Sequence, residues 1–302
     1  MKLFDIFQFN NEIDILEVRL EYYYDTIDYF IITEANETFY GKKKPFYYLN
    51  YQERLTKYKN KIIYNQIIEP YNPKKNYFLE KSKYFTNPNI SYQHKHEGKK
   101  VRNLADQFKR EIYQKDLQIL PLLNGFAKNE DIIIFGDIDE IVNIETLKKI
   151  KNKEKIIPPN QHLNIEMLFF IYNFTFLSKN PWYGTRIFSF GLLKSQNLSL
   201  DLMRHDLTRV DKQKFEVLKN SGWHFSTFGD INLIKQKLLD LNFNGRKTAF
   251  ILKIFYKMFN FLLVLQIKRG IDVISRGKFY KVDPSKYLPA NLLIMLKKNF
   301  AD

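Results

Sequence analysis

Residues 131–140 constrain the fold more than any other stretch of this chain, because an apolar run ends there in a group of carboxylates. Residues 132–135 are continuously apolar, which is typical of a strand that is buried on both faces in a parallel α/β sheet. Asp137, Asp139 and Glu140 follow at the carboxyl end of this strand. Open α/β sheets bind ligands at that edge, and carboxylates there favour a hard cation such as Mg²⁺ or Mn²⁺ that is shared with substrate phosphates.

An Asp-x-Asp pair is also typical of a solvated turn that caps a following helix. Here an apolar strand precedes the pair, Glu140 adds a further acid, and helical spacing begins near Ile144. This context favours a site for a metal ion and a diphosphate over a simple turn.

Strands and helices alternate along the first part of the chain. Residues 3–9 alternate in polarity as a strand does, and residues 13–20 then have the apolar spacing of a helix. The other predicted strands lie at residues 29–33, 61–68, 132–135, 163–176 and 186–190, with helices within 101–123 and from about 144. A polar stretch from Pro70 to about Lys100 is expected to form a long loop. This alternation predicts an α/β fold with a doubly wound, mostly parallel sheet.

The 302 residues and the 45% hydrophobic content are sufficient for one large domain. The pattern becomes helical and basic from Ile231, so we place a domain boundary near residue 235. Residues 1–235 are expected to form the main domain, and residues 236–302 a basic, helical C-terminal extension. The extension is interpreted either as helices packed on the main domain or as an amphipathic surface for an anionic membrane.

Cysteine is absent, which excludes disulfides, thiolate metal sites and cysteine nucleophiles. No secretory signal is visible, because the N-terminal residues reach Asp5 before an apolar segment develops. The apolar stretch at residues 258–267 is bracketed by lysines and is too short to cross a bilayer. We therefore expect a cytoplasmic protein that can contact the inner face of a membrane peripherally.

The net charge of +15 favours an anionic partner, which can be a nucleotide, a polyanion or a membrane surface. Two alternative functions are considered, the first from this charge and the second from the acids. The first is a basic, aromatic nucleic-acid-binding protein, in which the 20 tyrosines would stack on bases. The second is a metal-dependent nucleotidyltransferase that uses the same acids. Since acids in a binding surface repel phosphate unless a cation intervenes, we do not expect nucleic acid as a partner.

A series of sequence blocks, spread over most of the chain, is similar to one known family. The blocks are Phe4–Phe7, Phe9–Glu12, Leu16–Leu20, Asp28–Pro45, Arg110–Asp116, Asp131–Ile141, Trp182–Arg186, Gly222–Gly229 and Gly270–Asp272. In these blocks the chain resembles glycosyltransferase family 17, which includes the β-1,4-mannosyl-glycoprotein β-1,4-N-acetylglucosaminyltransferases. Their order and spacing make the resemblance specific.

The resemblance implies a GT-A fold and an inverting glycosyltransferase. The implied donor is a UDP-sugar, with UDP-N-acetylglucosamine favoured, and the implied acceptor is a glycan or a glycolipid. Such a transfer needs a divalent cation, Mn²⁺ or Mg²⁺, because the leaving UDP gains negative charge as the glycosidic bond breaks.

The resemblance also implies roles for the acids and for one histidine. Asp139 would be a direct metal ligand, Asp137 would bind the metal or the ribose and take part in catalysis, and Glu140 would hold the loop. His224 would be an additional metal ligand, with a core histidine beside Trp223 as the alternative.

Other residues are candidate contacts for the nucleotide. Phe9, Asn11, Glu34 and Asn36 stand at the ends of the first two predicted strands, where related folds hold uracil and ribose, although helix capping would also suit Glu34 and Asn36. Further candidates are Arg110, Gln114 and Lys115, which would share one face of a helix. That face would point either to the diphosphate or to solvent. Trp182 and Trp223 are interpreted as core residues that also offer rings to a sugar.

An inverting transfer needs a general base near the acceptor hydroxyl. The candidate acids are Glu166, Asp206 and Asp230. The chain departs from the family pattern at Asp230, where glycine is expected. It also departs after Lys237, where residues 241–246 replace a usual His and Glu, and this departure bears on the choice of acceptor.

Overall fold

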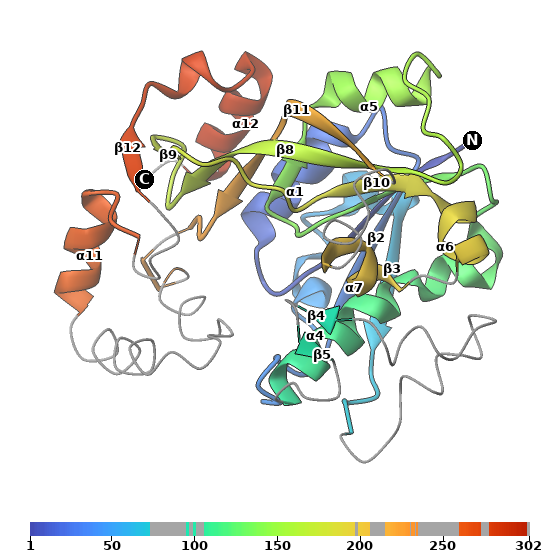
Figure 1. Ribbon diagram of the computed structural model, residues 1–302. Coiled ribbons are helices and arrows are strands. Elements are labelled where there is room, and N and C mark those ends of the chain that lie inside the picture. Colours follow the sequence, from blue (N-terminus) through green and yellow to red (C-terminus); the bar gives the residue numbers. More distant parts are fainter. Residues whose placement is uncertain are drawn as a thin grey trace.

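The computed structural model describes residues 1–72, 95–96, 99–100, 106–196, 199–205, 215–229, 231–232, 234, 260–272 and 278–300, and Figure 1 shows its ribbon. The strands are β1 (Leu3–Gln8), β2 (Tyr29–Ala35), β3 (Ile62–Ile67), β4 (Lys95–His96), β5 (Lys99–Lys100), β6 (Ile132–Phe135), β7 (Glu140–Val142), β8 (His162–Ile171), β9 (Phe176–Ser178), β10 (Arg186–Ser189), β11 (Phe215–Ser226) and β12 (Phe279–Lys281). The α-helices are α1 (Ile13–Tyr23), α4 (Asp106–Asp116), α5 (Ile144–Lys151), α6 (Phe190–Gln196), α7 (Leu200–His205), α11 (Asn260–Lys268) and α12 (Ala290–Phe300). Most of the predicted loop between Pro70 and Lys100 lies outside the described residues.

Within the described part of the chain, ten strands form one sheet in the order β12-β9-β8-β10-β6-β1-β2-β3, with β11 paired to β8 and β7 paired to β11. The neighbours β6, β1, β2 and β3 are parallel. β10 runs antiparallel between β6 and β8, and β12 runs antiparallel to β9 at the edge. The predicted α/β fold is confirmed, with parallel pairing among β6, β1, β2 and β3 and also between β8 and β11.

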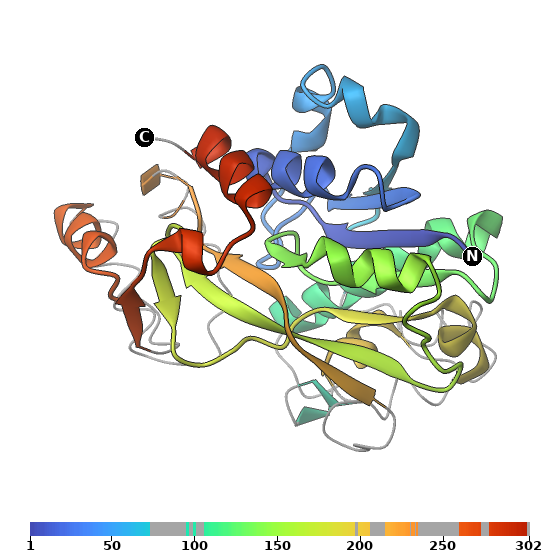
Figure 2. The ribbon, with the colours of Figure 1, turned by 90° about the horizontal axis from the view of Figure 1, so that it is seen from above.

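Helices cover both faces of the central strands (Figure 2). Successive side chains of a strand point to opposite faces, so each central strand contributes to two cores. On one face Phe7 of β1 and Ile134 of β6 pack with residues of α1, α5 and α12. On the other face Phe4 of β1 and Ile133 of β6 pack with residues of α6 and α7. Burial on both faces explains why β6 is apolar at every position.

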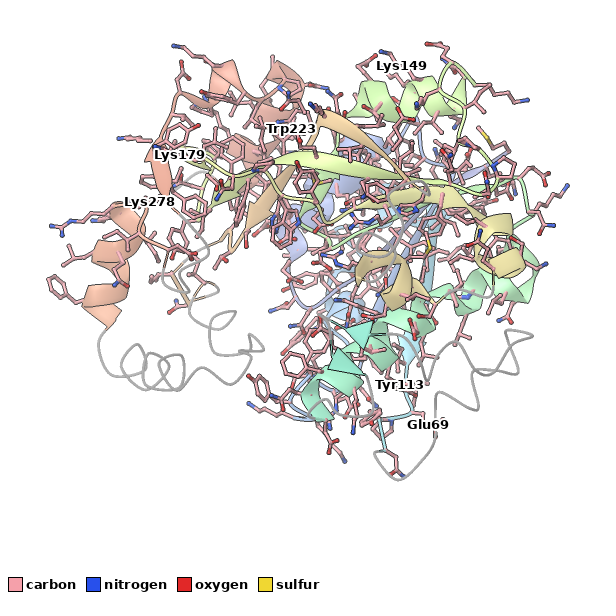
Figure 3. All side chains as sticks on the ribbon, viewed as in Figure 1. Glu69, Tyr113, Lys149, Lys179, Trp223 and Lys278 are labelled. Carbon is pink, nitrogen blue, oxygen red and sulfur yellow. The ribbon has the colours of Figure 1, made fainter. Side chains whose placement is uncertain are left out.

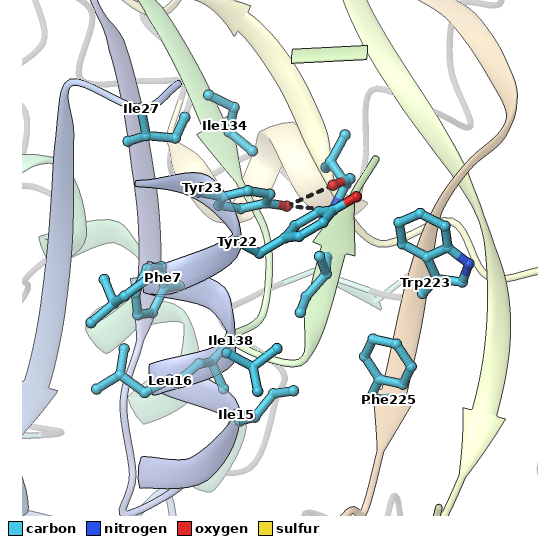
Figure 4. Packing of buried hydrophobic residues seen from close by; sticks show 14 of the residues in the cluster. Phe7, Ile15, Leu16, Tyr22, Tyr23, Ile27, Ile134, Ile138, Trp223 and Phe225 are labelled. Atoms are coloured by element: carbon cyan, nitrogen blue, oxygen red, sulfur yellow. Dashed lines mark hydrogen bonds between the residues drawn. The ribbon is translucent and has the colours of Figure 1, made fainter. Parts of the chain in front are cut away.

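Helix α1 is fixed to the sheet by aromatic side chains (Figure 4). Tyr22 packs edge-on against Trp223 of β11, with 6.4 Å between the ring centroids. The Tyr23 hydroxyl accepts a hydrogen bond from the N–H of Val142 and donates one to its carbonyl oxygen at 3.2 Å. These contacts fix α1 relative to β7, the strand that directly follows the Asp-x-Asp pair.

The C-terminal residues 278–300 also contact the main domain. α12 lies along α1 (Figure 2), and the indole of Trp223 donates to the carbonyl oxygen of Tyr287 at 2.8 Å, close to the start of α12 (Figure 3). Phe279 of β12 packs edge-on against Phe169 of β8, with 5.1 Å between the ring centroids. This part of the predicted extension therefore supplies an edge strand and a covering helix.

Residues 236–259, 273–277 and 301–302 of the predicted extension lie outside the described residues. Among the helices that the structure describes, none combines the length and the apolar character needed to span a bilayer.

Acid should destabilise this fold through His162. Burial, together with the charge of Arg186, lowers the pKa of His162 from 6.5 to about 4. Between these two values the unfolded chain binds a proton that the folded protein does not bind. The free energy of unfolding should therefore fall as the pH is lowered, by about 3 kcal/mol at a pH near 4 from this residue alone.

Urea titrations at a series of pH values measure this effect. The variant His162→Gln cannot take up the proton, so its free energy of unfolding should change less than that of the wild type over the same pH range. Parallel pH profiles for the two proteins would contradict the assignment.

Candidate active site at the acidic loop

The candidate site lies where the parallel strands end. β6, β1, β2 and β3 are parallel, so their carboxyl ends meet at one edge of the sheet. The acidic loop, which we define as residues 136–140, follows β6 at this edge. Phe9, Asn11, Glu34 and Asn36 come from the ends of β1 and β2 at the same edge. The parallel register of β1 with β2 and β6 brings these strand ends to one edge of the sheet.

Arg19 of α1 binds the backbone of the acidic loop. Its guanidinium donates to both carboxylate oxygens of Asp5 at 2.7 Å, and both side chains are fully buried. The Nη1 atom of Arg19 also donates to the carbonyl oxygens of Asp137, Ile138 and Glu140, at 2.8, 3.0 and 2.7 Å. Burial opposes the charge of Arg19, but Asp5 outweighs it and raises the pKa of Arg19. The loop carbonyls therefore face a permanent cation.

Glu140 is the fully buried acid of the loop, and its carboxylate accepts several hydrogen bonds. The donors are the Asp137 N–H at 3.1 Å, Trp182 Nε1 at 2.6 Å, Thr185 Oγ1 at 2.8 Å and Arg204 Nη2 at 2.9 Å. Burial alone would raise the pKa of Glu140, but Arg204 and the indole hydrogen bond outweigh it, so the pKa lies below its usual range. Glu140 is thus an anion that ties the loop to the segment 182–185 and to α7.

This packing leaves no space for larger residues beside Glu140. A Cβ atom at Gly184 would lie 1.7 Å from Glu140 Oε1, and one at Gly136 would lie 2.7 Å from Glu140 Oε2. Both positions therefore require glycine because the carboxylate approaches the backbone closely.

Strand register brings His224 to the acidic loop. His224 of β11 pairs with Glu140 of β7 on one side and with Phe169 of β8 on the other. Its ring stacks on Phe169, with 4.8 Å between centroids, and lies 4.6 Å from the indole of Trp182. Nε2 of His224 is 3.6 Å from Oδ1 of Asp139, which is longer than a hydrogen bond. The Nδ1 atom is buried without a hydrogen-bond partner.

Asp137 and Asp139 have different surroundings. The side chain of Asp137 is 47% exposed and its Oδ2 atom accepts from Arg204 Nη2 at 2.5 Å. The side chain of Asp139 is 12% exposed and faces His224. Only Ile138 separates the two acids in the sequence. They are nevertheless not equivalent, because their exposure and their partners differ.

Buried cations surround the acids. Arg204 of α7 bridges Asp137 and Glu140, and these carboxylates outweigh its burial and raise its pKa. Lys115 of α4 pairs with Glu111 at 2.6 Å and is buried. Burial lowers the pKa of Arg186 to about 10, and the charge of Arg204 adds to this effect. A site that combines acids with buried cations can hold a metal ion and an anionic leaving group together.

The predicted nucleotide contacts differ in exposure. Phe9 is fully buried in the core, so its ring offers no surface to a nucleotide. Glu34 is also fully buried, and its carboxylate binds the segment 44–48 and Tyr64. Asn11 has a positive φ of 72° and accepts from Tyr51 at 3.0 Å, and the amide of Asn36 donates to Ile68 at 2.9 Å.

Arg110 and Gln114 lie on α4 and bind the segment after β2. Arg110 donates to the Phe39 carbonyl oxygen at 2.5 Å, and Gln114 donates to the Glu37 carbonyl oxygen at 3.1 Å. Gln114 also accepts from Gln8 of β1 at 2.6 Å. Both side chains thus connect α4 with the strand ends of β1 and β2.

Of the candidate general bases, Glu166 alone lies within the described residues. Glu166 of β8 accepts from the Tyr183 hydroxyl at 2.6 Å. Asp206 and Asp230 lie outside the described residues.

Sequence reasoning assigned no role to Arg19, Arg186 or Arg204. Arg19 and Arg186 lie in sequence blocks that resemble the family. Their place in these blocks indicated a role, but it did not indicate which groups they bind. Arg204 lies outside those blocks, and only the position of α7 brings it to Glu140.

The protein atoms around Asp139 fit a divalent ion in part. Among the described residues there is no group of three His, Cys, Asp or Glu side chains close enough to hold a metal. Asp139 and His224 supply two donor groups, and a hard cation such as Mg²⁺ or Mn²⁺ commonly takes its remaining ligands from substrate phosphates and water. The unpartnered Nδ1 atom of His224 leaves its tautomer free to present Nε2 as an acceptor.

The structure defines the class of open α/β-sheet proteins, in which ligands bind at the carboxyl ends of the parallel strands. The specific relationship comes from comparison with known families. The model of glycosyltransferase family 17 matches residues 1–83 and 71–247, which include the acidic loop and His224. The chain therefore belongs to glycosyltransferase family 17 and is a glycosyltransferase. None of the curated proteins that were compared with the chain matches it.

The variant Arg19→Met should destabilise the protein by about 3–5 kcal/mol, because it leaves Asp5 as an unpaired buried charge and removes the donor to the loop carbonyls. Urea unfolding measures this change. The control is Arg54→Met, since Arg54 is 39% exposed in its ion pairs with Asp14 and Glu17 and should contribute no more than about 1 kcal/mol.

The double variant Asp5→Asn with Arg19→Met removes both buried charges, so it should be more stable than Arg19→Met alone. Equal losses from Arg19→Met and Arg54→Met would show that the buried ion pair is not a special stabilising contact.

Proposed function

We propose that this glycosyltransferase moves a sugar from a UDP-sugar donor to a hydroxyl group of a glycan or lipid-linked glycan, with inversion at the anomeric carbon. N-acetylglucosamine is the proposed sugar, because the family resemblance favours it. A GT-A fold and a requirement for Mn²⁺ or Mg²⁺ belong to the same proposal. The family match supports the transferase class, and the geometry of the acidic loop supports the metal.

The observation that carries the proposal is the 3.6 Å separation between Asp139 Oδ1 and His224 Nε2. Asp139 directly precedes β7 and His224 lies on β11, so the pairing of β7 with β11 brings the two residues side by side. Both side chains are nearly buried. A bound divalent ion would supply charge neutralisation for the departing UDP. Asp139 and His224 would hold this ion, while Asp137 is proposed to bind the donor through the ribose or the ion.

The other residues of the site are proposed to position the acidic loop and to bind the donor. Glu140 and Arg19 fix the loop from two sides, so the carboxylate of Asp139 is preorganised. Arg204 and Lys115 are proposed to attract the diphosphate of the donor, because both are buried cations close to Asp137. Asn11 and Asn36 are proposed contacts of the nucleoside, since they stand at the strand ends and keep partly exposed side chains.

The acceptor hydroxyl oxygen would attack the anomeric carbon as the bond from this carbon to UDP breaks, and its proton would pass to a general base. Glu166, Asp206 and Asp230 are the proposed candidates for that base.

The variant Asp139→Asn should lower the release of UDP from UDP-N-acetylglucosamine by at least about 100-fold, because the amide cannot neutralise a divalent ion. The assay compares Mn²⁺ with a metal-free buffer. Glu145→Gln is the control, since Glu145 is a carboxylate of α5 that is 65% exposed, and it should leave UDP release unchanged.

A binding measurement tests the metal separately from turnover. Calorimetric titration with Mn²⁺ in the presence of UDP should show weaker binding for Asp139→Asn than for Glu145→Gln. Metal-independent UDP release would contradict the assignment of Asp139, and strongly salt-dependent RNA binding without UDP release would favour the nucleic-acid alternative.

A further inference from the structure

Tyr183 presents an aromatic ring to solvent beside the acidic loop. Its side chain belongs to the exposed large hydrophobic residues, at 44% exposure. Its two neighbours in sequence, Trp182 and Gly184, both contact Glu140. Tyr183 is therefore exposed at a point where the adjacent residues belong to the candidate active site.

The ring of Tyr183 is held in place at both ends. Its hydroxyl donates to Oε2 of Glu166 on β8 at 2.6 Å, and this hydrogen bond raises the pKa of Tyr183, so the hydroxyl stays protonated. Its backbone carbonyl oxygen accepts from Nη1 of the buried Arg186 at 3.2 Å. The adjacent indole of Trp182 is anchored by Glu140. An exposed aromatic ring on a segment fixed by buried charges loses little conformational entropy when a ligand stacks on it.

Trp182 itself is less suited to stack on a sugar. One side of its ring system lies against His224 and Phe169, with centroid distances of 4.6 and 5.6 Å, and its only N–H group is bound to Glu140. The role of a sugar platform, which sequence reasoning gave to Trp182, fits its exposed neighbour better.

The charge beside Tyr183 selects the kind of ligand. Glu166 accepts the Tyr183 hydrogen bond with Oε2. Among the described residues, its Oε1 atom has only a long contact of 3.4 Å from the Asn220 N–H. A carboxylate oxygen with remaining lone pairs accepts hydrogen bonds from sugar hydroxyls and repels phosphates and other anions. The apolar face of a sugar ring can meanwhile stack on the aromatic ring.

We propose that Tyr183 and Glu166 form a subsite for an uncharged sugar ring of the acceptor, in which Tyr183 is the stacking surface and Glu166 accepts a hydroxyl hydrogen bond. The subsite deepens the proposed function, because it rests on the assignment of the acidic loop to the donor. The donor diphosphate is attracted to the cations near Asp137, whereas the described hydrogen-bond partners of the Tyr183 and Glu166 side chains include no cation.

Saturation-transfer NMR titrations with methyl β-D-mannopyranoside, as a neutral probe, and glucuronic acid, as an anionic one, test the subsite. Tyr183→Ala should weaken binding of the neutral probe by about tenfold, which corresponds to about 1.4 kcal/mol. Tyr183→Phe retains the ring and should bind more tightly than Tyr183→Ala. Glu166→Gln should bind glucuronic acid better than the wild type does, because the repelling charge is gone.

Tyr280→Ala is the matched control, since Tyr280 is a tyrosine of β12 with 40% exposure, and it should bind the neutral probe as the wild type does. Circular dichroism shows whether each variant folds. The subsite is overturned if the wild type binds no neutral probe, if Tyr183→Ala binds like the wild type, or if Tyr280→Ala loses as much affinity as Tyr183→Ala.

Release of UDP from UDP-N-acetylglucosamine by the wild type separates the two proposals. If UDP is released and Tyr183→Ala still binds the neutral probe normally, the subsite fails and the donor chemistry stands. If no UDP is released and Tyr183→Ala loses the neutral probe, the donor chemistry fails and the subsite stands.

Discussion

The candidate active site depends on one buried cation. Arg19 neutralises Asp5 inside the sheet and donates to carbonyl oxygens on both sides of Asp139. A short loop with several parallel carbonyl groups would otherwise leave acceptors unsatisfied in a buried setting. The guanidinium satisfies them from the side of α1, and Ile138 of the loop packs in the same core as Leu16 of α1. The conformation of the acidic loop consequently depends on the packing of α1, because Arg19 of α1 donates to its carbonyl oxygens.

Three acids within four residues have separate tasks because their environments differ. Glu140 has no exposed surface and several donors, so it is a structural anion. Asp139 lies beside an imidazole and suits a metal ion. Asp137 is half exposed and shares its charge with Arg204. Desolvation and local donors, rather than residue type, distinguish the three.

Much of this fold was predictable from the sequence because its signals are local. The apolar run of β6 and the alternation of β1 gave the strands, and the placement of acids after β6 gave the candidate site. The tasks of Arg19 and Arg204 were not predictable, since their partners in the acidic loop lie over 60 residues away in the chain and include backbone carbonyls, which have no residue type. The antiparallel direction of β10 likewise depends on tertiary pairing that no local pattern encodes.

The edge strand β12 has a consequence for how the protein can be divided. Its Phe279 packs against Phe169, and Phe169 stacks on the ring of His224. The C-terminal strand β12 therefore contacts the imidazole of His224 indirectly, through the rings of Phe279 and Phe169. A shortened protein that stops before β12 would keep every acid of the loop. It would lose Phe279, which packs against the ring that stacks on His224.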